Sequence, residues 1–159
     1  MAAVTPEPEE QEELQTGLER LRQRRAELRD SMRALEQALA APAPGRLDVW
    51  AERVHVAVVE LAGDFTQHID VTEGADGLYP GLLGAAPRLA SAVDGLTREH
   101  GEITALVDEL LACVRAPADG AAETTRDLGT ALLGRLSRHR QRGADLVYEA
   151  YQADIGGET

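Results

Sequence analysis

Three of the four histidines in this chain lie where the sequence otherwise repeats apolar residues. Between residues 89 and 114 apolar side chains recur at intervals of three or four, which predicts a helix with one face toward a core, and His100 lies in the middle of that face. His68 and His139 hold equivalent positions in two other stretches. Imidazoles from facing helices are the ligands with which helical bundles bind Fe, Zn, Cu or Ni. The three histidines therefore predict a metal site inside a helical core.

Each histidine could instead be a structural residue of the core that binds no metal. A single core histidine is more often a hydrogen-bonded structural residue than a ligand, whereas three at equivalent positions favour a metal. The fourth, His55, precedes His68 by thirteen residues, which is roughly 20 Å along a helix that rises about 1.5 Å per residue. The two cannot share an ion on a continuous helix. We therefore expect His55 to be a flanking residue.

Carboxylates near these histidines are the candidates to complete a four-ligand set. Glu73 follows His68 by five residues, just before a glycine that is expected to end the helix, so its side chain can turn back over the site. Asp145 is a weaker candidate, because it lies six residues past His139 and about 120° away from its face. Arg25 takes the equivalent position in the first predicted helix. Its permanent charge would repel a nearby divalent cation unless a carboxylate, for which Glu73 is the nearest candidate, pairs with it.

Four long amphipathic segments must position these side chains. They are separated by turns rich in proline or glycine, the longest being the predicted loop at 73–81, and they cover about residues 9–41, 47–72, 89–114 and 121–155. No stretch has the alternation of a strand. The sequence therefore predicts an all-α fold, an antiparallel up-down-up-down four-helix bundle, with a mobile N-terminal segment at 1–8 and a single helical domain at 9–156.

Composition narrows the class of protein. The net charge is −12, which argues against nucleic acid as a partner, and the arginines of the first and last predicted helices are expected to form solvated faces. A single cysteine excludes a disulfide framework and favours a reducing compartment. The N-terminus lacks an export signal, and no apolar run approaches the roughly 20 residues of a membrane span. We therefore expect a cytoplasmic protein that binds neither nucleic acid nor membrane.

Short motifs in a fixed order resemble those of the hemerythrin-like HHE cation-binding proteins. They are His68 followed by Glu73 and Leu-Tyr-Pro at 78–80, the Glu99–His100 pair, and His139 followed by DLVYEAY at 145–151. The resemblance covers nearly the whole chain and implies a four-helix bundle with a non-haem iron centre. His68, Glu73, His100 and His139 match metal-ligand positions of that family. The implied roles are O₂ or nitric oxide binding, iron handling or redox sensing, without enzymatic activity.

The sequence also departs from the family pattern at four ligand positions. Arg25, Thr72, Thr104 and Gly143 stand where members carry histidines or carboxylates. Three histidines and one glutamate favour one ion over two, with non-haem iron expected and zinc as the other suitable metal. Two further interpretations remain. The first is a metal-free bundle with Arg25 paired to Glu73, acting as a structural or protein-interaction module. The second is a three-histidine thiol-transfer enzyme of the DinB type, although the His-x-x-x-His pair typical of that class is absent.

Overall fold

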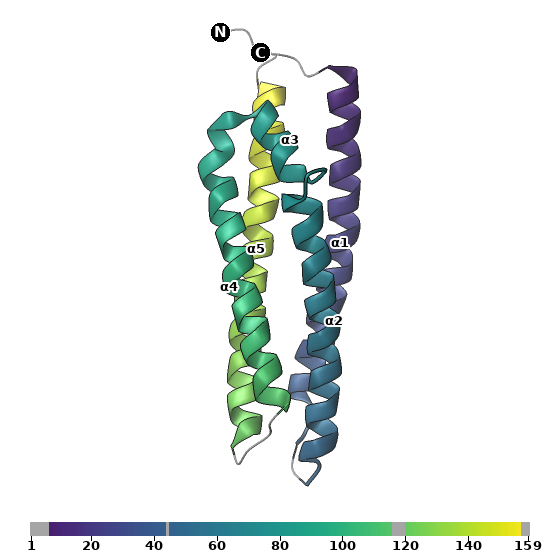
Figure 1. Ribbon diagram of the computed structural model, residues 1–159, viewed down its shortest axis with the longest axis vertical. Helices are drawn as coiled ribbons and strands as arrows, with labels where there is room; N and C mark the ends of the chain where they lie inside the picture. The colour runs from purple at the N-terminus through teal and green to yellow at the C-terminus, as the bar shows by residue number, and fades with distance from the viewer. Residues whose placement is uncertain (1–6, 44, 116–119, 157–159) are drawn as a thin grey trace.

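Four long helices and one short helix account for the regular structure of this chain, apart from a single 3-10 turn (Figure 1). The computed structural model describes residues 7–43, 45–115 and 120–156, and no strand occurs within these ranges. The long helices are α1 (Pro8–Ala40), α2 (Leu47–Glu73), α4 (Ala90–Arg115) and α5 (Ala121–Gly156). The short elements are α3 (Leu78–Ala85) and the 3-10 turn η1 (Pro87–Leu89). These bounds agree with the four predicted helices to within a few residues.

Helix α1 begins with a complete capping box. The side chain of Glu7 caps the N-terminal backbone, while Glu10 accepts a hydrogen bond from the Glu7 amide at 3.2 Å. Pro8 takes the first helical position, where its missing N–H is not needed. The predicted mobile segment at 1–8 lies largely outside the described residues. Of that segment, Glu7 and Pro8 form the start of α1.

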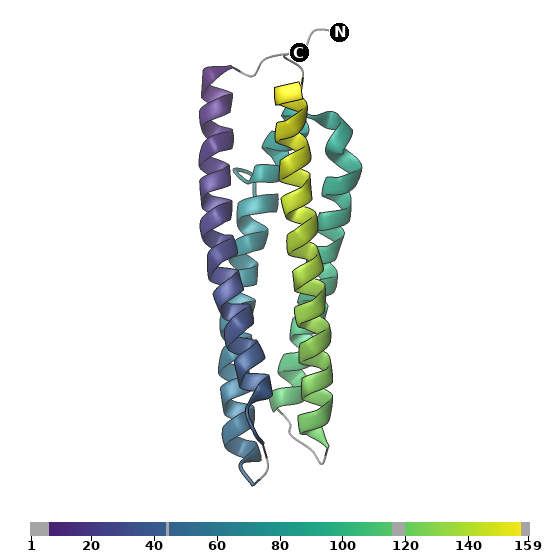
Figure 2. The same ribbon diagram turned by 180° about the vertical axis from the view of Figure 1, so that it is seen from behind.

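The four long helices alternate in direction. In Figure 1, α1 begins and α5 ends at the end of the bundle that carries α3, whereas α2 begins and α4 ends at the opposite end. The view from behind in Figure 2 shows the same arrangement. Helix α1 packs against α2 and α5, and α4 packs against α2 and α5, so the helices form a closed ring around a core. The all-α bundle predicted from the sequence is confirmed.

The core consists of two apolar clusters with a polar layer between them. One cluster fills the end near the α1–α2 turn and includes Phe65, Ile103 and Leu136. The other lies near α3 and includes Leu21 and Leu96. The buried polar side chains at the intermediate level are His68, Thr72, His100 and His139. Each histidine lies one helical turn from residues of an apolar cluster on the same helix, so packing of that cluster turns the imidazole toward the core.

Helix α3 lies partly within a segment that the sequence predicted to be a loop. Gly77 is its N-cap and Pro80 is its third residue, where a proline breaks no helical hydrogen bond. The three glycines and the proline between 73 and 81 obscured this short helix. Its Leu78 and Tyr79 side chains are buried, so α3 covers the core above the polar layer. No helix in the described ranges has an apolar run sufficient to cross a membrane.

Candidate metal centre

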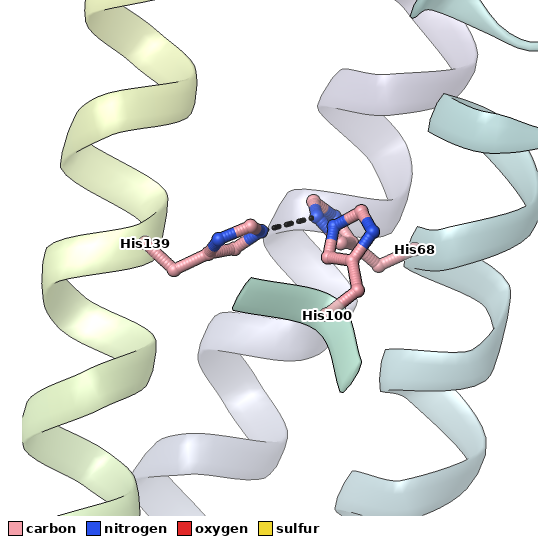
Figure 3. A group of neighbouring side chains, drawn as sticks. All are labelled: His68, His100 and His139. Atoms are coloured by element: carbon pink, nitrogen blue, oxygen red, sulfur yellow. Dashed lines mark hydrogen bonds between the residues drawn. The ribbon is translucent and has the colours of Figure 1, made fainter. Parts of the chain in front are cut away.

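The three predicted histidines converge at the centre of the bundle (Figure 3). They come from α2, α4 and α5, and each side chain is at most 5% exposed. One ring nitrogen from each lies within 4.8 Å of the others. The Nε2 atoms of His68 and His139 are 3.2 Å apart, which is hydrogen-bonding distance. The regular spacing of apolar residues in each helix therefore predicted a real cluster.

Aromatic rings enclose the cluster. Phe65, one turn before His68 on α2, stacks on the His68 ring and makes edge contacts with the His100 and His139 rings. From α3, the Tyr79 ring stacks on His100 at an interplanar angle of 6° and a centroid distance of 6.1 Å. Rings packed on two sides limit rotation of the imidazoles and exclude water. Burial raises the pKa of the Tyr79 hydroxyl, so it stays a neutral donor at neutral pH.

All three imidazoles are neutral at neutral pH. Burial, then the neighbouring His100 and His139, and then Arg25 and Arg140, lower the pKa of His68 to about 3. Burial is also the main cause that lowers the pKa of His139, to about 4. It lowers the pKa of His100 despite the opposing effect of Glu73. A neutral imidazole keeps a lone pair free for a metal ion or a hydrogen-bond donor.

Two carboxylates approach the outer nitrogens of this cluster. His100 Nδ1 donates a hydrogen bond of 2.5 Å to Glu73 Oε2. Glu99 Oε2 lies 3.5 Å from His139 Nδ1, while Glu99 Oε1 accepts a hydrogen bond of 2.5 Å from Arg142. Burial opposes ionisation of Glu99, but the Arg142 hydrogen bond and the adjacent His139 outweigh it and lower its pKa. A carboxylate hydrogen-bonded to Nδ1, as Glu73 is to His100, fixes the tautomer that leaves Nε2 available as a ligand.

The nitrogen atoms available in this layer suit a metal ion. Among the described residues, three ring nitrogens of this layer are buried without a hydrogen-bond partner: His68 Nδ1, His100 Nε2 and His139 Nδ1, the last of which lies 3.5 Å from Glu99 Oε2. Two imidazole ligands of a tetrahedral zinc ion, with Zn–N bonds of about 2.0–2.1 Å, lie about 3.3–3.4 Å apart. The separation of 3.2 Å between His68 Nε2 and His139 Nε2 is close to that value. Three neutral imidazoles with oriented rings thus match the donor set expected for zinc or non-haem iron.

The structure places the other predicted site residues in different surroundings. Glu73 lies next to His100, and whether it also binds a metal directly stays a prediction. Asp145 accepts a hydrogen bond from Gln141 in an exposed position on α5. His55 lies outside the three-histidine group, as expected. Glu73 turns toward α4, where it pairs with His100. Among the described residues, therefore, no ion pair joins Glu73 to Arg25. The Arg25–Glu73 pair that was predicted for a metal-free bundle is wrong.

Sequence reasoning missed two residues that contribute to this layer. In the sequence, Glu99 stands out only as part of the Glu99–His100 pair. Because it immediately precedes His100, its side chain points about 100° around the helix from that of His100, toward a neighbouring helix. Which helix that is depends on the order of the bundle. Arg140 was assigned to a solvated face, but its Nε atom is buried and it borders the histidines. Its position directly after His139 was the feature of the sequence that could have placed Arg140 near the site.

A groove lies between α4 and α5, on the outer side of Glu99. Its volume is about 450 Å³, and Glu99 and Arg142 are among the residues that line it. Glu99 also approaches His139, so the ion pair between Glu99 and Arg142 stands between the groove and the buried ring.

A comparison with models of protein families gives a match over most of the chain. The family model described as the Hemerythrin HHE cation binding domain matches residues 16–151. No curated protein and no solved structure matches the chain. The matched range contains all three histidines together with Glu73, Glu99 and Arg25.

Proposed function

Because this chain belongs to the hemerythrin HHE cation-binding domain family, we propose that His68, His100 and His139 bind a single non-haem iron ion. One observation carries the proposal: three buried, neutral imidazoles present ring nitrogens within 4.8 Å of one another. Imidazole also suits zinc, so zinc is the alternative metal.

The surroundings of the histidines support one ion over two. The carboxylates of Glu73 and Glu99 lie at the Nδ1 atoms of His100 and His139, where they orient the rings. On the side of α1, Arg25 stands where a further ligand would be needed, and its charge disfavours a second cation. A di-iron centre needs additional bridging carboxylates, for which Thr72 and Gly143 offer none.

The chain's own residues hold and shield the proposed ion. The three histidines bind it, Glu73 and Glu99 keep the rings in the required tautomers, and Phe65 and Tyr79 exclude water. A ferrous ion held by these three histidines would have the capacity to bind a diatomic gas such as O₂ or nitric oxide. We therefore propose gas binding, redox sensing or iron handling in the cytoplasm, without enzymatic turnover.

A metal-free bundle is the second candidate. The hydrogen bond between His68 and His139 and that between His100 and Glu73 support it, because they partly satisfy the buried imidazoles without an ion. In that case the chain would be a structural or protein-interaction module.

Elemental analysis of protein purified without an affinity tag distinguishes the two candidates. We expect at most one equivalent of iron or zinc per chain, and no metal in His100→Ala. His55→Ala is the matched control, because His55 lies outside the cluster, and it should retain the metal. Metal-free wild-type protein after growth and refolding with iron and zinc would favour the second candidate. Two equivalents of iron with the absorption of an oxo-bridged pair, or loss of metal in His55→Ala, would contradict the single-ion site.

A further inference from the structure

Helix α2 carries apolar side chains on its outer face as well as on its core face. Among the described residues, the exposed large hydrophobic side chains are Val49, Val56, Val59, Tyr148 and Tyr151. All three valines belong to α2, and each is about half exposed, from 47% to 54%. On a solvated helix a valine buries little surface, and it forms helix less readily than alanine, glutamate or arginine. The outer face of α2 therefore has the composition of a contact surface.

The exposed valines follow the spacing of helices that pack side by side. Val49, Val56 and Val59 lie at intervals of seven and three residues, and Gly63 follows four residues later. In a heptad pattern these are the positions that face a partner helix. Val54 is fully buried and projects from the opposite side of α2, toward the core. We call Val49, Val56, Val59 and Gly63 the valine face.

Two opposite charges border the valine face on the side of α1. Arg53 and Glu60 are exposed and lie seven residues apart, so they stand two turns apart along the same edge. At 100° per residue both project within about 40° of Asp64, whose carboxylate accepts a hydrogen bond from Ser31 of α1. Reversing the direction of a helix exchanges the order of the two charges along this edge. A second copy that runs antiparallel thus brings Arg53 of each chain beside Glu60 of the other.

Glu52 favours the antiparallel direction for the second helix, because it lies between Val49 and Val56 on the same line. In a parallel pair Glu52 would face Glu52 of the second copy, and two like charges in an apolar contact repel each other. In an antiparallel pair Val56 packs against Val59 of the second copy, and Glu52 comes opposite Gly63. There is space at that glycine, because no atom lies within 4 Å of a Cβ added there.

We propose that this protein forms an antiparallel homodimer through the outer faces of its two α2 helices. The valine faces form the centre of the contact, and the Arg53–Glu60 ion pair occurs twice, related by a two-fold axis. The contact covers residues 49–66 and leaves the histidines facing the core of each chain. One helix per chain makes a small interface, so the dimer forms reversibly at concentrations on the order of micromolar.

Sedimentation equilibrium of untagged protein, at concentrations from about 5 to about 500 µM, tests the dimer. We expect the mass of wild-type protein to rise with concentration from that of one chain, 17.1 kDa, toward that of two. Val56→Glu places a charge in the apolar centre and should weaken association at least tenfold. Tyr148→Glu is the matched control, because it replaces an exposed hydrophobic side chain on α5, and it should associate as wild type does.

Charge reversal tests the direction of the two helices. Arg53→Glu and Glu60→Arg should each weaken self-association at least tenfold, because each places like charges opposite each other. A mixture of the two variants should associate as wild type does, since both ion pairs re-form when one chain of each kind meets the other. In a parallel dimer residues 53 and 60 do not meet, so mixing would restore nothing.

Wild-type protein that stays monomeric up to about 500 µM would overturn the proposal, and so would a dimer that Val56→Glu leaves unchanged. Charge variants that do not complement each other on mixing would overturn the antiparallel arrangement. All the substituted side chains are exposed, and circular dichroism of each variant checks that it folds. The substituted positions lie outside the histidine cluster, so failure of the dimer is distinguishable from failure of the proposed iron site.

Discussion

His68 Nε2 and His139 Nε2 lie 3.2 Å apart across the centre of the bundle, so one proton lies between two neutral rings. Glu99 approaches Nδ1 of His139, which favours a proton on that atom and makes His139 Nε2 the acceptor. His68 then donates through Nε2, and the buried Nδ1 atoms of both rings have no hydrogen-bond partner. Binding of an ion at these two Nε2 atoms must therefore displace the shared proton. The hydrogen bond between His68 and His139, which stabilises the metal-free bundle, thus competes with metal binding.

The buried histidines should make the metal-free protein lose stability in mild acid. The pKa values of His68 and His139 are about 3 and about 4, below the ordinary 6.5 of the unfolded chain. Below pH 6.5 the unfolded state binds protons that the folded state does not, so stability is full above that pH and falls toward pH 4. Each histidine contributes a slope of up to about 1.4 kcal/mol per pH unit.

Urea unfolding in EDTA between pH 7.5 and 5 measures this slope. The range lies above the titration of most carboxylates, so the histidines dominate it. His68→Gln should flatten the dependence, because the amide does not titrate. A wild-type stability that is constant from pH 7.5 to 5 would show that the rings can be protonated in the folded bundle.

Glu73→Gln should reduce metal affinity by roughly tenfold to a hundredfold, the usual effect of losing a carboxylate that orients a ligating histidine. The amide oxygen can still accept the hydrogen bond from His100 Nδ1, so the fold should persist. Competition with a chelator of known affinity provides the measurement. Glu102→Gln is the control, since Glu102 pairs with Arg135 on the exposed surface. Equal affinities for Glu73→Gln and wild type would show that the negative charge of Glu73 contributes neither to orienting His100 nor to binding the ion.

The histidine cluster could be predicted from the spacing of apolar residues, because that spacing shows which face of each helix is buried without any knowledge of the other helices. His100 could be placed inward from its own helix, and so could His68 and His139. Glu73 could be placed near the site, since it follows His68 at the end of α2. The direction in which its carboxylate turns was not predictable, because it depends on competition between His100 and Arg25 in three dimensions.

The residues on the flanks of the helices were harder to assign. Glu99 and Arg140 each lie one position from a histidine, and their roles follow from which neighbouring helix they face. Amphipathic patterns give the buried face of a helix but not the order of helices around the core. Helix α3 was missed for a different reason, since glycine and proline are turn residues unless, like Gly77 and Pro80, they stand at a helix start.

Gly143→Ala should stabilise the protein by about 0.5–1 kcal/mol. Gly143 is an interior residue of α5, where alanine lowers the entropy cost of forming a helix. The nearest atom to the new Cβ, Arg25 Nη1 at 3.9 Å, is at ordinary contact distance. Gly120→Ala is the matched contrast, because its φ of +81° disfavours a side chain and the substitution should destabilise. Urea midpoints that shift in the same direction for both variants would contradict this assignment.

Arg25→His should raise metal affinity by roughly tenfold or more, because it removes a cation near the histidines and adds an imidazole at the equivalent position of α1. Arg25→Met separates these effects, since it removes the charge without supplying a ligand, and it should give a smaller gain. Arg25 has no ion pair with Glu73, so neither variant orphans a buried partner, and the loss of stability should stay near 1 kcal/mol. Chelator competition and urea unfolding on the same preparations measure both quantities. If affinity stays flat or falls in a folded Arg25→His protein, position 25 does not share a metal level with the three histidines, and the metal-free bundle becomes the better description.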